Sequence, residues 1–179
     1  KSRYFNESKS HKMEKLISNS VTYLQQFIFN KHKQKIMIMP RSVHQYHPVR
    51  GGFLKHLVTA AEMSMDVLPY YPTLNRDLVL CGLFLHDIGK VEGINDDLQP
   101  GYTNAGRLIG HVALGVDILR EASSSFTNIP EDILLKLEHI ILSHEGGGNS
   151  GGVRRMAKLQ SVRGTHDIIG DAASRHSHV

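Results

Sequence analysis

Hydrophobic residues recur along the chain with a spacing that is typical of amphipathic helices. In residues 11–30, apolar side chains return every three or four positions, which places them on one face of a helix. Only the five residues KIMIM (35–39) are compatible with a short strand. The fold class predicted is therefore all-α, a compact bundle of five to seven helices. The predicted helices are 11–30, 52–68, 75–88, 106–122, 130–143 and a less regular one at 153–173.

Proline and glycine residues separate these segments. Residues 31–52 contain two prolines and a Gly-Gly pair, so they are expected to be irregular. The glycine-rich stretch 146–152 is expected to form a mobile loop. No internal repeat or linker divides the chain, so residues 1–179 are interpreted as a single domain. Its ends, 1–10 and 174–179, are expected to be frayed.

The most apolar of the predicted helices ends in a group of polar residues. Helix 75–88 is apolar on most sides and is expected to be buried. It leads into LFLHDIGK (83–90), in which His86 and Asp87 are adjacent. A buried carboxylate loses its hydration and needs a partner. A divalent metal, an arginine and backbone amides are all candidates for the partner of Asp87.

Composition narrows the class of protein without identifying a ligand. The formal net charge of +4 permits a nucleic-acid partner but does not argue for one. A single cysteine, Cys81, fits a reducing compartment, and a cytoplasmic location is expected. No apolar run approaches the roughly 20 residues that span a bilayer, so no membrane association is expected. Histidine is abundant, with 12 residues in 179, which makes the positions of the histidines important.

Several histidines border the apolar faces of different predicted helices. His56, His111 and His144 each lie beside such a face, on three separate segments. Helical bundles hold metal ions with side chains that converge from facing helices. Imidazole and carboxylate ligands together suit one or two divalent ions of Mn, Fe, Zn, Co or Ni better than Ca. Asp167 and Asp171 are four residues apart, and so share a face of the last predicted helix.

The order H…HD…H…H…D resembles the HD-domain superfamily of metal-dependent phosphohydrolases. The resemblance covers roughly residues 40–145 and is closest to the HD domain of YhaM-type 3′-5′ exoribonucleases. The matching segments are HPVRGGFLKH, YYPTLNRDLVLCGLFLHDIGK, GYTNAGRLIGH and LEHIILSHEG. One departure is that Glu145 stands where the family often has a second histidine. The resemblance implies an all-α HD fold that carries a divalent-metal site.

The resemblance also implies a set of metal ligands. The expected ligands are His56, His86, Asp87, His111, His144 and Asp167. Asp171 is the alternative to Asp167 for the last position. Asp87 is the natural bridge between two ions, because a carboxylate has two oxygens to share.

The residues expected to act in catalysis and substrate binding lie close to these ligands. Asp87 and Lys90 are the expected catalytic residues, since Lys90 can neutralise phosphate charge; a solvated surface lysine is the alternative. Arg107 lies four residues before His111 on the predicted helix, so it is a candidate for phosphate binding. A surface ion pair is as plausible for it. The resemblance places His47 beside the site as a substrate contact.

The function predicted from these observations is a divalent-metal-dependent phosphohydrolase. Its expected substrate is a phosphate ester of a nucleotide or short RNA, as in a 3′-5′ exoribonuclease. The alternative is a degenerate HD domain that binds a nucleotide or a partner protein without catalysis, which the glutamate at 145 motivates. A third hypothesis is a helical domain that only supports a neighbouring catalytic domain. The sequence also leaves open a second copy of the chain in a homo-oligomer, or an upstream nucleic-acid-binding domain, as a partner.

Overall fold

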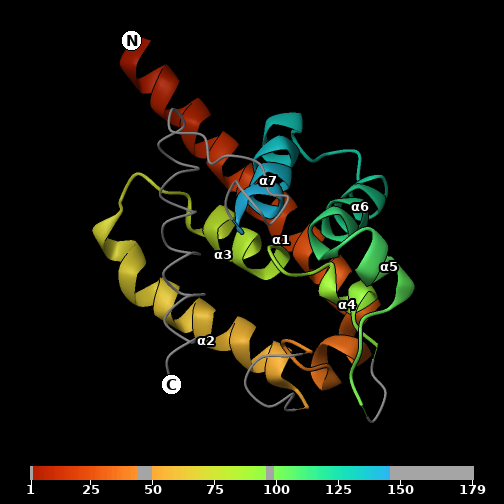
Figure 1. Cartoon of the computed structure of the whole chain (residues 1–179). Helices are drawn as coiled ribbons and strands as arrows, with labels where there is room; N and C mark the ends of the chain where they lie inside the picture. Colours follow the sequence, from red (N-terminus) through yellow and green to blue (C-terminus); the bar gives the residue numbers. More distant parts are fainter. Residues whose placement is uncertain (1, 44–49, 96–98, 146–179) are drawn as a thin grey trace.

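The computed structural model describes residues 2–43, 50–95 and 99–145 (Figure 1), and within these ranges the chain is all-α. An isolated bridge joins Ile94 to Tyr102, and no strand is present in the described part. The predicted all-α bundle is confirmed. The elements are α1 (Ser2–Ile38), α2 (Gly52–Val67), the 3-10 helix η1 (Leu68–Tyr70), α3 (Arg76–Leu85), α4 (Lys90–Gly93), α5 (Asn104–Leu108), α6 (His111–Ser123) and α7 (Glu131–Ser143).

The first helix is longer than its apolar pattern predicted. Helix α1 starts at Ser2, within the segment expected to be frayed, and continues to Ile38. The possible strand at 35–39 is therefore wrong for residues 35–38, which are helical. The reason is that Leu24, Ile28 and Ile36 lie on one helical face and are all fully buried. Helix α1 packs with this face against α2, α3 and α6.

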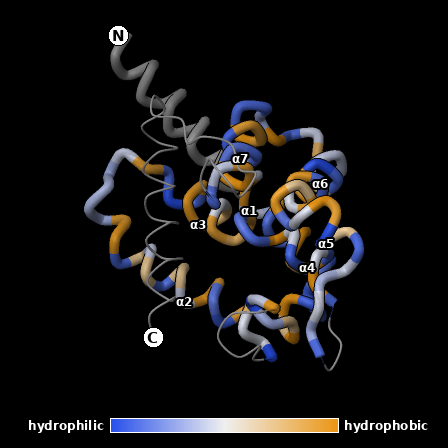
Figure 2. Tube along the Cα trace, in the orientation of Figure 1, coloured by the Kyte–Doolittle hydropathy of each residue, from blue (hydrophilic) through white to orange (hydrophobic). Residues whose placement is uncertain are grey.

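Helix α3 lies at the centre of the bundle, where α1, α2 and α7 pack around it. Its first turn is capped by Asn75, whose Oδ1 accepts a hydrogen bond from Leu78 N at 2.9 Å. Seven of its residues are buried: Leu78, Val79, Cys81, Gly82, Leu83, Phe84 and Leu85. Figure 2 shows hydrophobic residues along α3 and α7, and His86 and Asp87, which follow α3, are 2% and 4% exposed. The polar pair after α3 therefore enters the interior.

The segment predicted as one helix over 106–122 is two helices. Helix α5 ends at Leu108 and α6 begins at His111, after Gly110 with a φ of 83°. A positive φ favours glycine, and here it interrupts the helix. As a result Arg107 and His111 do not share a helical face, and the spacing argument that paired them is wrong.

No helix in the described ranges combines the length and the apolar character that a membrane span requires.

Candidate metal centre

A first group of potential ligands joins α2 to the turn that follows α3. His56 comes from the buried face of α2, which it shares with Phe53 and Ala60. The Nε2 atoms of His56 and His86 are 3.4 Å apart. Oδ2 of Asp87 lies 3.3 Å from His86 Nε2 and 3.9 Å from His56 Nε2. All three residues are buried, and their ligand atoms lie close enough together for one metal ion.

A second group forms on the other oxygen of Asp87. Oδ1 of this carboxylate lies 3.5 Å from His111 Nε2 and 3.6 Å from His144 Nε2. His111 is the first residue of α6, and His144 directly follows α7. Their ligand atoms, like those of the first group, are within 4.8 Å of one another. Asp87 thus belongs to both groups and presents one oxygen to each.

Backbone carbonyls fix the orientation of two of the imidazole rings. His86 Nδ1 donates to the carbonyl of Leu83 at 2.5 Å, and His144 Nδ1 donates to Ile141 O at 2.7 Å. A carbonyl oxygen only accepts, so Nδ1 carries the proton in both rings. In the neutral rings, Nε2 then bears the lone pair and points at Asp87. This is the arrangement by which a protein prepares histidine as a metal ligand.

The donor set fits a divalent cation. Nε2 of His111 and Nε2 of His144 are buried and make no hydrogen bond within the described ranges. Burial, and next the neighbouring His86, lower the pKa of His56 to about 3, so its ring is neutral near pH 7. Buried nitrogens with available lone pairs and a shared carboxylate are ligands that first-row divalent ions prefer. These side chains are therefore suited to hold a divalent metal ion.

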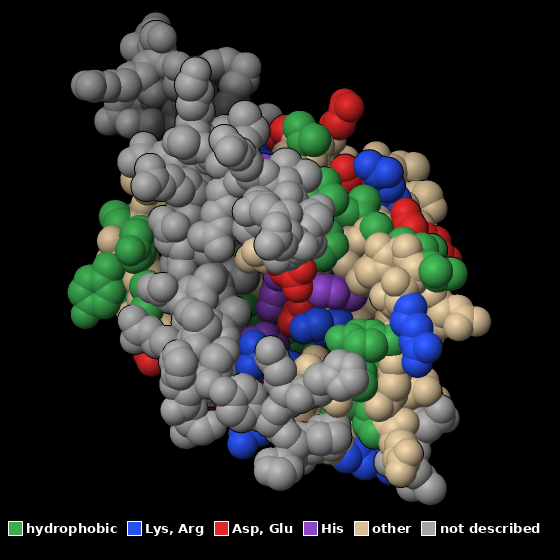
Figure 3. Space-filling view, in the orientation of Figure 1, with side chains coloured by type: hydrophobic (Ala, Val, Ile, Leu, Met, Phe, Trp, Pro, Cys, Tyr) green, Lys and Arg blue, Asp and Glu red, His purple; other side chains and the backbone are tan. Residues whose placement is uncertain are grey.

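Lys90 is the positive charge nearest to the shared carboxylate. Its Nζ lies 2.7 Å from Asp87 Oδ2 and its side chain is 18% exposed. Burial alone would raise the pKa of Asp87, but Lys90 and then His86 outweigh it and hold that pKa well below its usual value. Asp87 is consequently ionised near neutral pH. Figure 3 shows histidine, acidic and basic side chains gathered on this face of the molecule.

Glycines bring the elements of the centre into close contact. A Cβ atom at Gly89 would lie 1.9 Å from His111 O and 2.5 Å from Gly115 N. Here the glycine after the His-Asp pair allows the backbone of the first turn of α6 to pack directly on the α3–α4 turn. A side chain at Gly89 would separate His111 from Asp87.

Gly89→Ala is expected to destabilise the fold by about 3 kcal/mol, the upper end of the cost of overpacking a core. Both atoms that the new methyl group would meet nearest are backbone atoms, which cannot rotate away. Urea unfolding followed by circular dichroism measures this loss. Gly101→Ala is the matched control, because its Cβ would meet only the side chain of Asn95 at 3.7 Å. Equal stability of the two variants would contradict the close packing.

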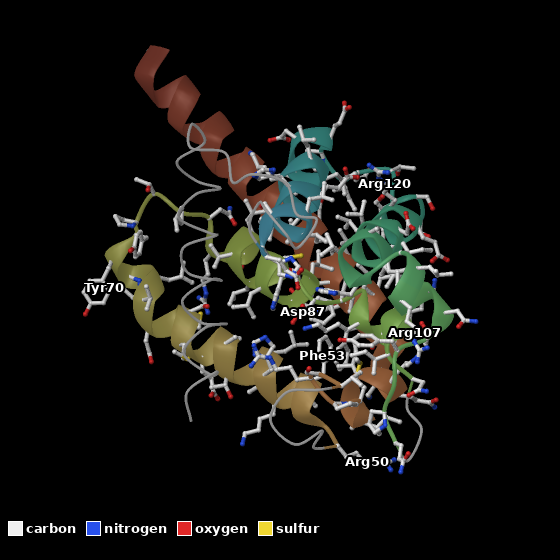
Figure 4. All side chains as sticks on the ribbon, viewed as in Figure 1. Arg50, Phe53, Tyr70, Asp87, Arg107 and Arg120 are labelled. Carbon is white, nitrogen blue, oxygen red and sulfur yellow. The ribbon has the colours of Figure 1, made fainter. Side chains whose placement is uncertain are left out.

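Among the remaining sequence candidates, Arg107 alone lies within the described residues. Arg107 is exposed on α5 and is separated from Asp87 in Figure 4, and no described contact joins it to the two groups. His47, Asp167 and Asp171 lie outside the described residues. Glu145 was not among the sequence candidates, yet its Oε1 lies 3.2 Å from His111 Nε2. Its position directly after His144 was the available signal.

Comparison with known proteins decides the family. The family model described as "HD domain" matches residues 53–174, which is more than half of the chain. The chain belongs to the HD domain family. The match begins at the start of the helix that carries His56 and extends past both groups of potential ligands. The resemblance inferred from the sequence is thus confirmed.

Relatives of this chain include proteins that are named as 3′-5′ exoribonucleases. The chain is 32% identical over 125 residues to the 3′-5′ exoribonuclease YhaM of Shouchella clausii, covering 70% of this chain and 39% of that protein. It is 31% identical over 132 residues to the protein of the same name from Bacillus subtilis, covering 74% and 42%. The chain spans about two fifths of the length of these relatives. No solved structure shows significant similarity to it.

Family membership and geometry agree on the general chemistry. HD domains bind divalent metals, and this HD domain has His and Asp side chains positioned for a metal. The two observations support a metal-dependent phosphohydrolase.

Proposed function

We propose that this HD domain hydrolyses a phosphate ester of RNA or of a nucleotide, with one or two divalent ions held by His56, His86, Asp87, His111 and His144. The observation that carries the proposal is the position of Asp87, whose two oxygens face two different pairs of imidazoles. Two-metal sites that act on phosphate esters hold their ions a few ångströms apart and share ligands between them. Asp167, with Asp171 as the alternative, is proposed as the remaining ligand.

The residues of the chain have separate tasks in this proposal. Asp87 holds the site together and supplies negative charge to both groups. The rings of His86 and His144 present fixed lone pairs, because the carbonyls of Leu83 and Ile141 hold their Nδ1 protons. A bound divalent ion supplies Lewis acidity, which activates water and neutralises phosphate charge. Lys90 exchanges its contact with Asp87 for one with a phosphate oxygen, and His47 contacts the substrate.

The relatives favour RNA as the substrate. YhaM proteins are named as 3′-5′ exoribonucleases, and the HD-domain match over residues 53–174 includes both groups of potential ligands. We therefore propose a short single-stranded RNA with a free 3′ end as the substrate, and Arg107 as a phosphate contact outside the ligand groups. Its exposure on α5 leaves the guanidinium free to meet a strand that approaches the site.

A substrate panel tests the proposal. The protein is incubated with Mn²⁺ or Zn²⁺ and with 3′-hydroxyl RNA, 3′-phosphorylated RNA, bis(p-nitrophenyl) phosphate and p-nitrophenyl phosphate. Metal-dependent release of nucleotides from 3′-hydroxyl RNA is the expected result. Cleavage of the monoester alone would point to a phosphatase. A protein that binds the ions and hydrolyses none of the four would be the degenerate, binding HD domain instead.

Lys90→Ala is expected to lower kcat/KM for RNA by about 10- to 100-fold, the effect of losing one charged hydrogen bond. Bound metal should persist or become tighter, since the ammonium group beside Asp87 Oδ2 competes with a cation. Steady-state kinetics and metal analysis of the same preparation separate the two effects. Lys33→Ala, an exposed position on α1, is the control. Unchanged kinetics with tighter metal binding would show that Lys90 only balances the charge of Asp87.

A further inference from the structure

Among the described ion pairs, Asp87 and Glu145 are the two acidic residues that contact a histidine of the two groups. Its Oε1 lies 3.2 Å from His111 Nε2, and the same nitrogen lies 3.5 Å from Asp87 Oδ1. The ring of His111 therefore has a carboxylate on two sides. The side chain of Glu145 is 35% exposed, so it can adjust its position without displacing the buried core.

Charge is distributed unequally around Asp87. The ammonium group of Lys90 contacts Oδ2, on the side of His56 and His86. The carboxylate of Glu145 lies on the side of Oδ1, next to His111. A dication enters a partly buried site more easily where its charge is offset by nearby anions. The second group is thus the more negative of the two.

The donor atoms of the two groups also differ once Glu145 is counted. Each group offers two imidazole nitrogens and an oxygen of Asp87 among the described residues. Only the second group has a further carboxylate beside it, because Glu145 Oε1 lies 3.2 Å from His111 Nε2. Oxygen-rich sites favour harder ions such as Mn²⁺, and imidazole suits Zn²⁺.

We propose that Glu145 is a ligand of the ion bound by Asp87, His111 and His144, and that it makes this group prefer Mn²⁺ to Zn²⁺. The inference rests on the proposed function in that it assumes a metal in the second group. The carboxylate lowers the net positive charge of that group and adds a hard donor. A glutamate in place of a neutral imidazole at this position changes the choice of ion without removing the site.

Metal titration of Glu145→Gln tests the assignment. Isothermal titration with MnCl₂ and separately with ZnCl₂ is carried out on the metal-stripped protein. We expect Glu145→Gln to weaken one class of Mn²⁺ site by about tenfold or more and to leave the other class unchanged. Glu145→His is expected to bind Zn²⁺ in preference to Mn²⁺ at the same class. Glu131→Gln, an exposed glutamate in the first turn of α7, controls for the lost charge.

Two background variants locate the effect. When Glu145→Gln is added to His56→Ala, which already lacks a ligand of the first group, Mn²⁺ affinity should still fall. When it is added to His111→Ala, which lacks a ligand of the second group, no further loss of Mn²⁺ affinity is expected. If Mn²⁺ bound to two classes of site in the wild-type protein and Glu145→Gln changed neither affinity, Glu145 would not be a ligand, although the metal centre would stand. A wild-type protein that binds neither ion would overturn the proposed metal centre together with it. Circular dichroism of each variant establishes that it is folded.

Discussion

Asp87→Asn is expected to abolish binding of both divalent ions and to lower phosphodiester hydrolysis by more than about 100-fold. Substitutions that only orient a ligand typically cost 10- to 100-fold, and Asp87 is the residue common to both groups. The amide keeps the shape of the side chain but presents one oxygen and no charge. Metal analysis by mass spectrometry, together with RNA hydrolysis, measures both losses in one preparation.

The control for this variant is Asp117→Asn. Asp117 lies on the exposed side of α6, the helix that begins with His111, so the charge is lost from the same part of the fold. Metal content and activity should both be normal in this protein. If Asp87→Asn retained two bound ions and full turnover, the shared carboxylate would have no role in the site.

Binding of Mn²⁺ is expected to raise the melting temperature of the protein substantially. In the metal-free fold, the lone pairs of His86 and His144 converge on one buried carboxylate, and a cation satisfies them. At a free concentration 100 times its Kd, one ion adds about 2.7 kcal/mol to the free energy of unfolding. For a chain of this length that corresponds to a rise of about 5–10 °C.

Differential scanning calorimetry with and without MnCl₂ measures the shift, and a chelator should reverse it. Mg²⁺ should give a smaller rise, because imidazole is a poor ligand for it. The Asp87→Asn variant should show no rise at any concentration. An equal rise in that variant would mean that the stabilising ion binds elsewhere on the chain.

The helical pattern of the sequence was sufficient to predict the fold class. A helix that packs through one face has apolar residues that repeat with the helical period. This repeat can be recognised in the sequence without knowledge of the tertiary structure. The same pattern wrongly predicted one continuous helix across Gly110, because the apolar spacing continues on both sides of this glycine. Only the positive φ of that glycine shows that the chain turns there. A helix interrupted by one residue cannot be recognised from periodicity alone.

The convergence of the site was predictable in part. A carboxylate directly after a buried helix needs a partner. The resemblance to HD domains implied the imidazoles of His56, His111 and His144, and the structure brings them to Asp87. The role of Gly89 could not be predicted, because it depends on the crossing of the α3–α4 turn with α6. Glu145 was missed for a similar reason. A glutamate beside a glycine-rich stretch resembles a surface residue until His111 is placed next to it.

Anomalous diffraction from crystals grown with MnCl₂, recorded at the manganese absorption edge, locates bound ions most directly. We expect one peak in contact with His56, His86 and Asp87, and a second in contact with Asp87, His111 and His144. Crystals in which these imidazoles face no anomalous peak, while manganese binds elsewhere or not at all, would contradict this expectation.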